Sequence, residues 1–282
     1  PTNNGFDIAI MKFNATGTSR VYATYIGGTN GSEQPHSLVV DANNNLIIAG
    51  RTSSSNYPGT KYGVGGGGFD IVLTKLNSSG SALIGSRIIG GSGEDGVNIK
   101  DKEICKSTAN NPGCAESINR NYGDDARSEV IVDADGNIYL SSCTQSTNFP
   151  TTTNAAQVTN GGRNAVTGRA QDAVVLKFDP TLANALFSTY LGGKDDDAAF
   201  VLALNPSNND IYVAGATVSS DFPGDKTGSI APGFLGGSSD GFVAIFDNNG
   251  ALKKSTYFGT TGIDLIYGIQ FDKFSFPYIM GT

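Results

Sequence analysis

Acidic side chains recur in the glycine-rich loops of this 282-residue chain, and they are the residues best suited to chemistry. Ca²⁺ prefers several hard oxygen ligands and tolerates irregular geometry, so a ring of such loops could hold this ion. Alternatively, each carboxylate accepts backbone N–H bonds and fastens its own loop. Both interpretations stay open for the six candidate ligands Glu94, Asp95, Asp195, Asp196, Asp197 and Asp264. We expect no required cofactor, and calcium is the one candidate ion.

Histidine and cysteine supply little further chemistry. His36 is the only histidine and has no nucleophile-elbow sequence near it, which argues against Ser-His-Asp catalysis and a histidine-based zinc site. Cys105 and Cys114 flank a turn-rich stretch, and we expect a disulfide between them, typical of an oxidising or extracellular compartment. Cys143 lies in an apolar run and is expected to be a small buried thiol.

Four copies of one pattern must position these residues. Each copy opens with an apolar strand that carries an early aspartate, at Asp7, Asp70, Asp172 and Asp240. A turn rich in Asn, Asp and Gly leads to a second strand, written ATYIGG, SRIIGG, STYLGG and STYFGT in the four copies. A second hairpin follows, and a Phe/Tyr-Pro step closes three of the copies. We expect that no side chain fits at the glycine pair.

Repeated four-stranded antiparallel units predict an all-β propeller, because each blade buries its faces only against its neighbours. We expect one propeller region over residues 1–282, part of a larger ring that further blades or domains of the same polypeptide complete. Closure by four blades alone is the alternative. The approximate copies are residues 5–68, 69–170, 171–239 and 240–282.

Charge and hydropathy exclude two classes of partner. The net charge is −7 and basic residues do not cluster, which argues against binding to nucleic acid phosphates. No apolar run has the roughly 18 to 20 residues that a membrane-spanning helix needs. The chain opens at Pro1 without a signal-peptide pattern, so we expect a mature or trimmed product.

The copies differ most in an insertion at residues 92–125 and in the long linker at residues 151–170. Long loops on a rigid scaffold are frequent recognition elements, although such loops are also tolerated as decoration. The candidate recognition residues are Lys100, Lys102, Lys106, Arg120, Tyr122, Arg163 and Arg169.

Several phrases taken together resemble the SBBP β-propeller repeat over nearly the whole chain. They are DAVVLKF at residues 172–178, STYLGG at 188–193, VDADGNIYL at 132–140 and DFP at 221–223. The resemblance implies a secreted or surface protein of bacteria, notably Bacteroidota, and an association with type IX secretion.

We therefore expect a non-enzymatic scaffold or binding module for protein or glycan partners, located outside the cell or on its outer surface. The alternative is a polysaccharide-active propeller enzyme that uses paired carboxylates, for example Asp195 to Asp197 with an acid from another blade. Two features argue against this alternative. The acids recur in every copy, and the chain has no Trp to stack on a sugar ring.

Overall fold

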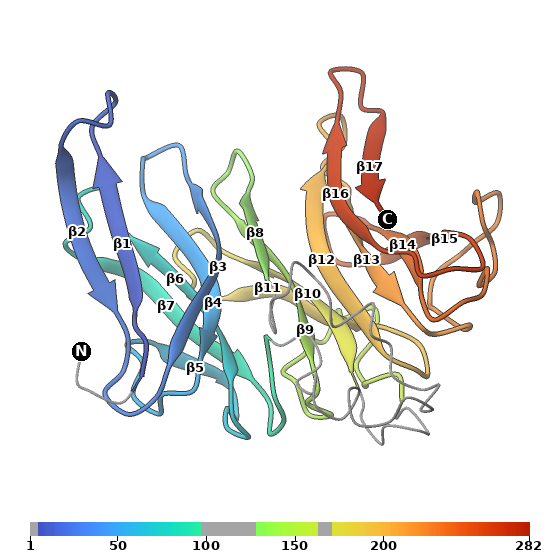
Figure 1. Cartoon of the computed structure of the whole chain (residues 1–282), viewed down its shortest axis with the longest axis horizontal. Coiled ribbons are helices and arrows are strands. Elements are labelled where there is room, and N and C mark those ends of the chain that lie inside the picture. Colours follow the sequence, from blue (N-terminus) through green and yellow to red (C-terminus); the bar gives the residue numbers. More distant parts are fainter. Residues whose placement is uncertain (1–4, 97–127, 163–170) are drawn as a thin grey trace.

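The chain folds as an array of β-sheets that have the form of propeller blades, as the sequence predicts (Figure 1). The computed structural model describes residues 5–96, 128–162 and 171–282. Every regular element in these ranges is a β-strand. Among them, no helix is long and apolar enough to cross a membrane.

Three complete blades occupy the middle of the array. The first contains β3 (Glu33–Val40), β4 (Leu46–Thr52), β6 (Asp70–Leu76) and β7 (Leu83–Gly90), with the short parallel strand β5 (Thr60–Gly63) at its edge. The second contains β8 (Glu129–Val132), β9 (Ile138–Thr144), β10 (Asp172–Phe178) and β11 (Ala185–Leu191). The third contains β12 (Asp197–Leu204), β13 (Ile211–Thr217), β14 (Asp240–Phe246) and β15 (Leu252–Phe258).

A half-blade of two strands flanks the complete blades at each end (Figure 1). The N-terminal half-blade pairs β1 (Ile8–Phe13) with β2 (Arg20–Ile26). The C-terminal half-blade pairs β16 (Ile266–Phe271) with β17 (Pro277–Gly281). Strands β3, β8, β12 and β16 contact one another in that order, so they are the corresponding first strands of successive blades.

The blades are offset by two strands from the sequence copies. Each sheet takes its first two strands from one copy and its last two from the next, as β12 and β13 join β14 and β15. Consequently β1 and β2 occupy the third and fourth positions of a blade, whereas β16 and β17 occupy the first and second.

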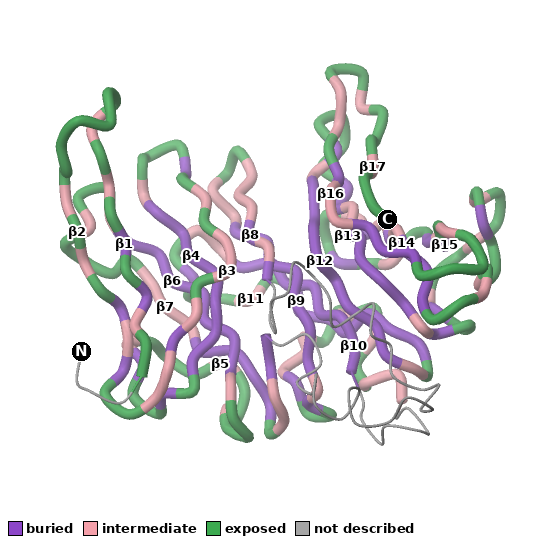
Figure 2. The backbone as a smooth tube through the Cα atoms, viewed as in Figure 1, coloured by how far each residue is buried: buried purple, intermediate pink, exposed green. Residues whose placement is uncertain are grey.

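The hydrophobic core lies between the faces of neighbouring blades. Tyr139 and Phe187 of the second blade share one cluster with Val213 and Phe242 of the third. Strands β6 and β10 are buried along their whole length because neighbours cover both faces, and Figure 2 shows this burial concentrated in the middle of the array. Burial of apolar surface at about 25 cal/mol per Å² therefore links one blade to the next.

A recurring lysine adds a polar link between blades. It lies in β1 and in the third strand of the first two complete blades, and its Nζ donates to the turn between the last two strands of the following blade; β14 has Ile245 instead. Lys75 reaches the Pro180 carbonyl at 2.8 Å, and Lys177 reaches Oδ1 of Asn248 at 2.6 Å. Lys12 of β1 likewise reaches the Ser78 carbonyl at 3.1 Å. The lysine repeats because the same gap between blades repeats.

The tyrosine of the repeated phrase holds the aromatic-proline linker against its blade. Tyr190 Oη accepts the Phe149 N–H at 2.7 Å and donates to the Ser146 carbonyl at 2.8 Å, all within the core. Tyr257 makes the matching pair of bonds in the next blade, with Phe222 and Ser219. In these two copies the phrase therefore supplies the buried hydroxyl that holds the linker, whereas copy two has Ile88 at this position.

Substitution Tyr190→Phe should lower the free energy of unfolding by about 1 to 3 kcal/mol, because it leaves a buried N–H and a buried carbonyl unpaired. Urea denaturation followed by fluorescence measures this loss. The matched control is Tyr25→Phe, at an exposed position, which should change stability by less than about 0.5 kcal/mol. Equal effects of the two substitutions would contradict the anchoring role.

Candidate functional site

A buried carboxylate corner joins each blade to the next. In the best-defined corner, Asp197 at the start of β12 accepts the Gly193 N–H at 2.7 Å and the Ser219 hydroxyl at 2.9 Å. Asp172, at the start of β10, accepts the Gly161 N–H at 2.7 Å. Both carboxyl groups are completely buried and face Gly192, which ends the repeated phrase.

The glycine pair is required because these side chains fill the corner. A Cβ on Gly192 would lie 2.6 Å from Oδ1 of Asp172 and 2.8 Å from Oδ2 of Asp197. A Cβ on Gly193 would lie 2.5 Å from the Cβ of Ser219. The prediction that no side chain fits here is confirmed, although the obstacle is largely other side chains.

Burial makes the paired carboxyls unusually weak acids. It raises the pKa of Asp172 to about 7, and burial followed by repulsion from Asp172 raises the pKa of Asp197 well above its usual range. Within the described chain, Oδ1 of each residue has no hydrogen-bond partner. A proton held on this pair removes the cost of burying two negative charges.

The same corner recurs along the array. Asp95 accepts the Gly91 N–H and the Ser146 hydroxyl, both at 2.9 Å, and burial raises its pKa to about 7. Asp264 accepts the Thr260 N–H at 2.8 Å, and Glu33 accepts the Thr52 hydroxyl at 2.5 Å. These carboxylates therefore fasten the blades, which is the second of the two interpretations left open by the sequence.

The remaining candidate calcium ligands lie beside these corners without joining into one site. Glu94 accepts the Phe69 N–H at 3.3 Å, Asp195 is partly exposed, and Asp196 is buried. Across residues 5–96, 128–162 and 171–282, no group of three His, Cys, Asp or Glu side chains could hold a metal ion. Calcium binding stays a prediction for which the described residues provide no cluster.

The predicted recognition residues and the predicted disulfide cannot be located. The recognition residues Lys100, Lys102, Lys106, Arg120, Tyr122, Arg163 and Arg169, and the cysteines Cys105 and Cys114, all lie outside the described residues. The first residues of the predicted insertion, residues 92–125, belong to the blade. Asp95 is the buried acid of a carboxylate corner.

His36 and Cys143 both have structural roles. His36 Nδ1 lies 3.1 Å from the Ser128 hydroxyl of the next blade. Cys143 is a fully buried thiol, and burial raises its pKa to about 12, so its prediction is confirmed. A thiol in this state is a poor nucleophile at neutral pH.

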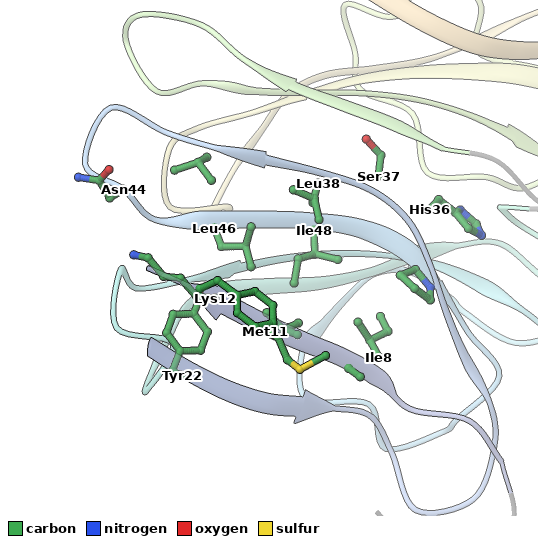
Figure 3. Close-up of a pocket in the computed structure, with 15 residues that line it drawn as sticks. Ile8, Met11, Lys12, Tyr22, His36, Ser37, Leu38, Asn44, Leu46 and Ile48 are labelled. Carbon is green, nitrogen blue, oxygen red and sulfur yellow. The ribbon is translucent and has the colours of Figure 1, made fainter. Parts of the chain in front are cut away.

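Among the described residues, one open feature is a groove beside the N-terminal half-blade, which sequence reasoning missed. It has a volume of about 720 Å³ and lies between β1 and the hairpin of β3 and β4 (Figure 3). Ile8, Ile10, Leu46 and Ile48 line its wall, and Leu38 is 67% exposed within it. We call this hollow the N-terminal groove. Its only sequence signal is alternation of apolar residues in two strands, which is also typical of ordinary blade packing.

The protonated corners should make the protein less stable as pH rises. In the unfolded chain these aspartates titrate near 3.8, whereas the folded pKa values are raised, so their stabilisation is complete below about pH 4 and is lost towards pH 7 and above. Substitution Asp197→Asn should flatten the fall in unfolding free energy between pH 5 and pH 8 by on the order of 1 kcal/mol or more.

Chemical denaturation across this pH range tests the expectation. Asp221→Asn is the matched control, because Asp221 is partly exposed and the Lys194 N–H and ammonium group outweigh its modest burial and lower its pKa. The control should keep the wild-type slope above pH 5. An Asp197→Asn slope as steep as that of the wild type would show that the corner does not hold the proton.

Comparison with known proteins places the repeat in a family. No curated protein matches the chain. A family model described as SBBP, Beta-propeller repeat, matches residues 21–58. The matched segment runs from β2 through β3 and β4 to the aromatic-proline step, and the blade corners and linkers built from it recur in the rest of the array. Residues 21–58 therefore contain an SBBP-type β-propeller repeat.

Proposed function

We propose that this protein is a non-enzymatic scaffold that binds a protein partner in the N-terminal groove. The observation that carries the proposal is the groove itself, an apolar hollow of about 720 Å³ that can receive alternate side chains of an extended segment. Apolar side chains form most of its wall, and Lys12, His36 and Asn44 lie along its length (Figure 3).

The apolar wall favours a protein segment over a glycan. Sugars are recognised by aromatic platforms and dense polar contacts, and the chain has no Trp. An extended segment can instead pair with an exposed strand edge while alternate side chains enter the hollow. Strand β1 has such an edge, since among the described strands it pairs only with β2.

The buried carboxylates support a scaffold over the alternative of a polysaccharide-active enzyme. Asp197, one of the predicted catalytic acids, is completely buried. Its carboxylate accepts hydrogen bonds from groups of its own corner. A glycosidase acid must reach the glycosidic oxygen.

A secreted or surface location, with type IX secretion as the route, is part of the same proposal. The expected disulfide between Cys105 and Cys114 and the family resemblance support it. Cell fractionation with immunodetection tests the location, and a cytoplasmic protein with reduced cysteines would contradict it.

Peptide arrays and glycan arrays probed with the full chain test the binding function. Extended peptides with alternating apolar residues should bind, and Leu38→Asp should weaken that binding by roughly tenfold or more because it places a charge in the groove. Val158→Asp, at a similarly exposed position outside the groove lining, is the matched control and should bind normally.

Two results would contradict the binding function. Peptide binding that Leu38→Asp leaves unchanged would exclude the groove as the site. Release of reducing ends from a polysaccharide, lost in Asp197→Asn, would favour the enzyme instead.

A further inference from the structure

One contact between the second and third blades differs in kind from its counterpart. The Lys177 ammonium lies 2.6 Å from Oδ1 of Asn248, in the turn between β14 and β15, and 3.3 Å from the main-chain carbonyl oxygen of the same residue. At the matching junction of the first and second blades, Lys75 donates to the main-chain carbonyl of Pro180. The junction at Asn248 therefore presents a side-chain carboxamide to the amine, which Pro180 cannot do.

The neighbouring groups fix the orientation of this carboxamide. Tyr139 Oη lies 2.8 Å from the same Oδ1 and 2.9 Å from Oδ2 of Asp133. An ammonium group can only donate, so the amide oxygen of Asn248, and not its nitrogen, faces Lys177. With a C=O bond of about 1.23 Å, the Cγ carbon lies no more than about 3.8 Å from Nζ. This approaches the separation of about 3 to 3.5 Å from which an amine attacks a carbonyl carbon.

Burial prepares Lys177 to act as a nucleophile. The residue is buried between the blades, and loss of hydration lowers the pKa of its ammonium group against the attraction of Asp133 and Asp135. A lysine in such a position loses its proton more readily, and the free amine reacts with carbonyl carbons. The Tyr139 ring, whose centroid is 4.9 Å from Nζ, holds the side chain in place.

We propose that Lys177 and Asn248 form an intramolecular isopeptide bond that joins the second blade to the third. Nζ, after losing one proton to water, attacks Cγ of Asn248 and forms a C–N bond, while the carbonyl electron pair moves to Oδ1. The Tyr139 hydroxyl donates to this developing oxyanion. One proton then passes from Nζ to Nδ2, the Cγ–Nδ2 bond breaks, and the carbonyl re-forms as ammonia leaves.

The position of Asn248 suits this reaction. The residue is exposed on its turn while Oδ1 contacts the buried amine, so ammonia has a path to solvent. An amine and a carboxamide give a secondary amide and ammonia, so no further reactant is consumed. The bond spans 71 positions of the chain, and the two blades cannot separate even when the apolar contacts between them open. It is independent of the N-terminal groove and of what binds there.

Mass spectrometry of the full chain tests the bond directly. The reduced, purified wild-type protein should weigh less than its sequence by one ammonia molecule, whereas Lys177→Arg should have its full sequence mass. Trypsin should leave Lys177 uncut and release a branched peptide that joins residues 170–194 to residues 227–253. Lys75→Arg is the matched control, because it changes the corresponding lysine and should keep the loss of ammonia.

The role of the hydroxyl is tested by the rate of bond formation. In freshly synthesised protein sampled over time, Tyr139→Phe should form the branched peptide roughly tenfold more slowly or slower still, because the oxyanion loses its donor. Circular dichroism checks that the variant is folded. An unchanged rate in the folded variant would overturn the role of Tyr139.

Two results would overturn the bond itself. One is a folded wild-type chain that keeps its full sequence mass after prolonged incubation and is cleaved by trypsin after Lys177. The other is a loss of ammonia without the branched peptide, because a succinimide at the Asn249–Gly250 step gives the same change in mass.

Discussion

The structure depends on the carboxylate corner, where a buried acid closes the gap between two successive blades. Asp197 binds a backbone N–H at the end of β11 and a hydroxyl that follows β13, so one side chain ties two sheets together. A proton on the Asp172 and Asp197 pair makes this burial tolerable. The glycine pair leaves the space that both carboxyls occupy. The corner therefore fixes where each blade begins.

Much of the fold follows from the sequence because its rules are local and repeated. Alternating apolar strands, Asn and Gly turns and a recurring GG phrase predicted the all-β propeller blades that the structure contains. The offset between copy and blade was missed. Strand pairing between β13 and β14 joins residues separated by a long linker, and the linker carries no local signal of which neighbour it will pair with.

The site was harder to predict than the fold. The sequence identifies Asp95, Asp197 and Asp264 as recurring carboxylates. It does not show their burial or their hydrogen-bond partners, which distinguish a structural carboxylate from a metal ligand. The groove was missed because Leu38 and Ile10 look the same whether or not a neighbouring strand covers them. Exposure is a property of the assembled array, so a period-two pattern alone cannot reveal it.

The two-strand offset has a consequence for how such a protein can change length by gene duplication. Each copy contributes two strands to one blade and two strands to the next, so an added copy lengthens the array by one whole blade wherever the recombination breakpoint falls within the repeat. The new copy supplies part of the residues of two carboxylate corners. The neighbouring copies supply the remaining residues of those corners. Growth by unequal crossing-over is therefore compatible with the fold at every intermediate length.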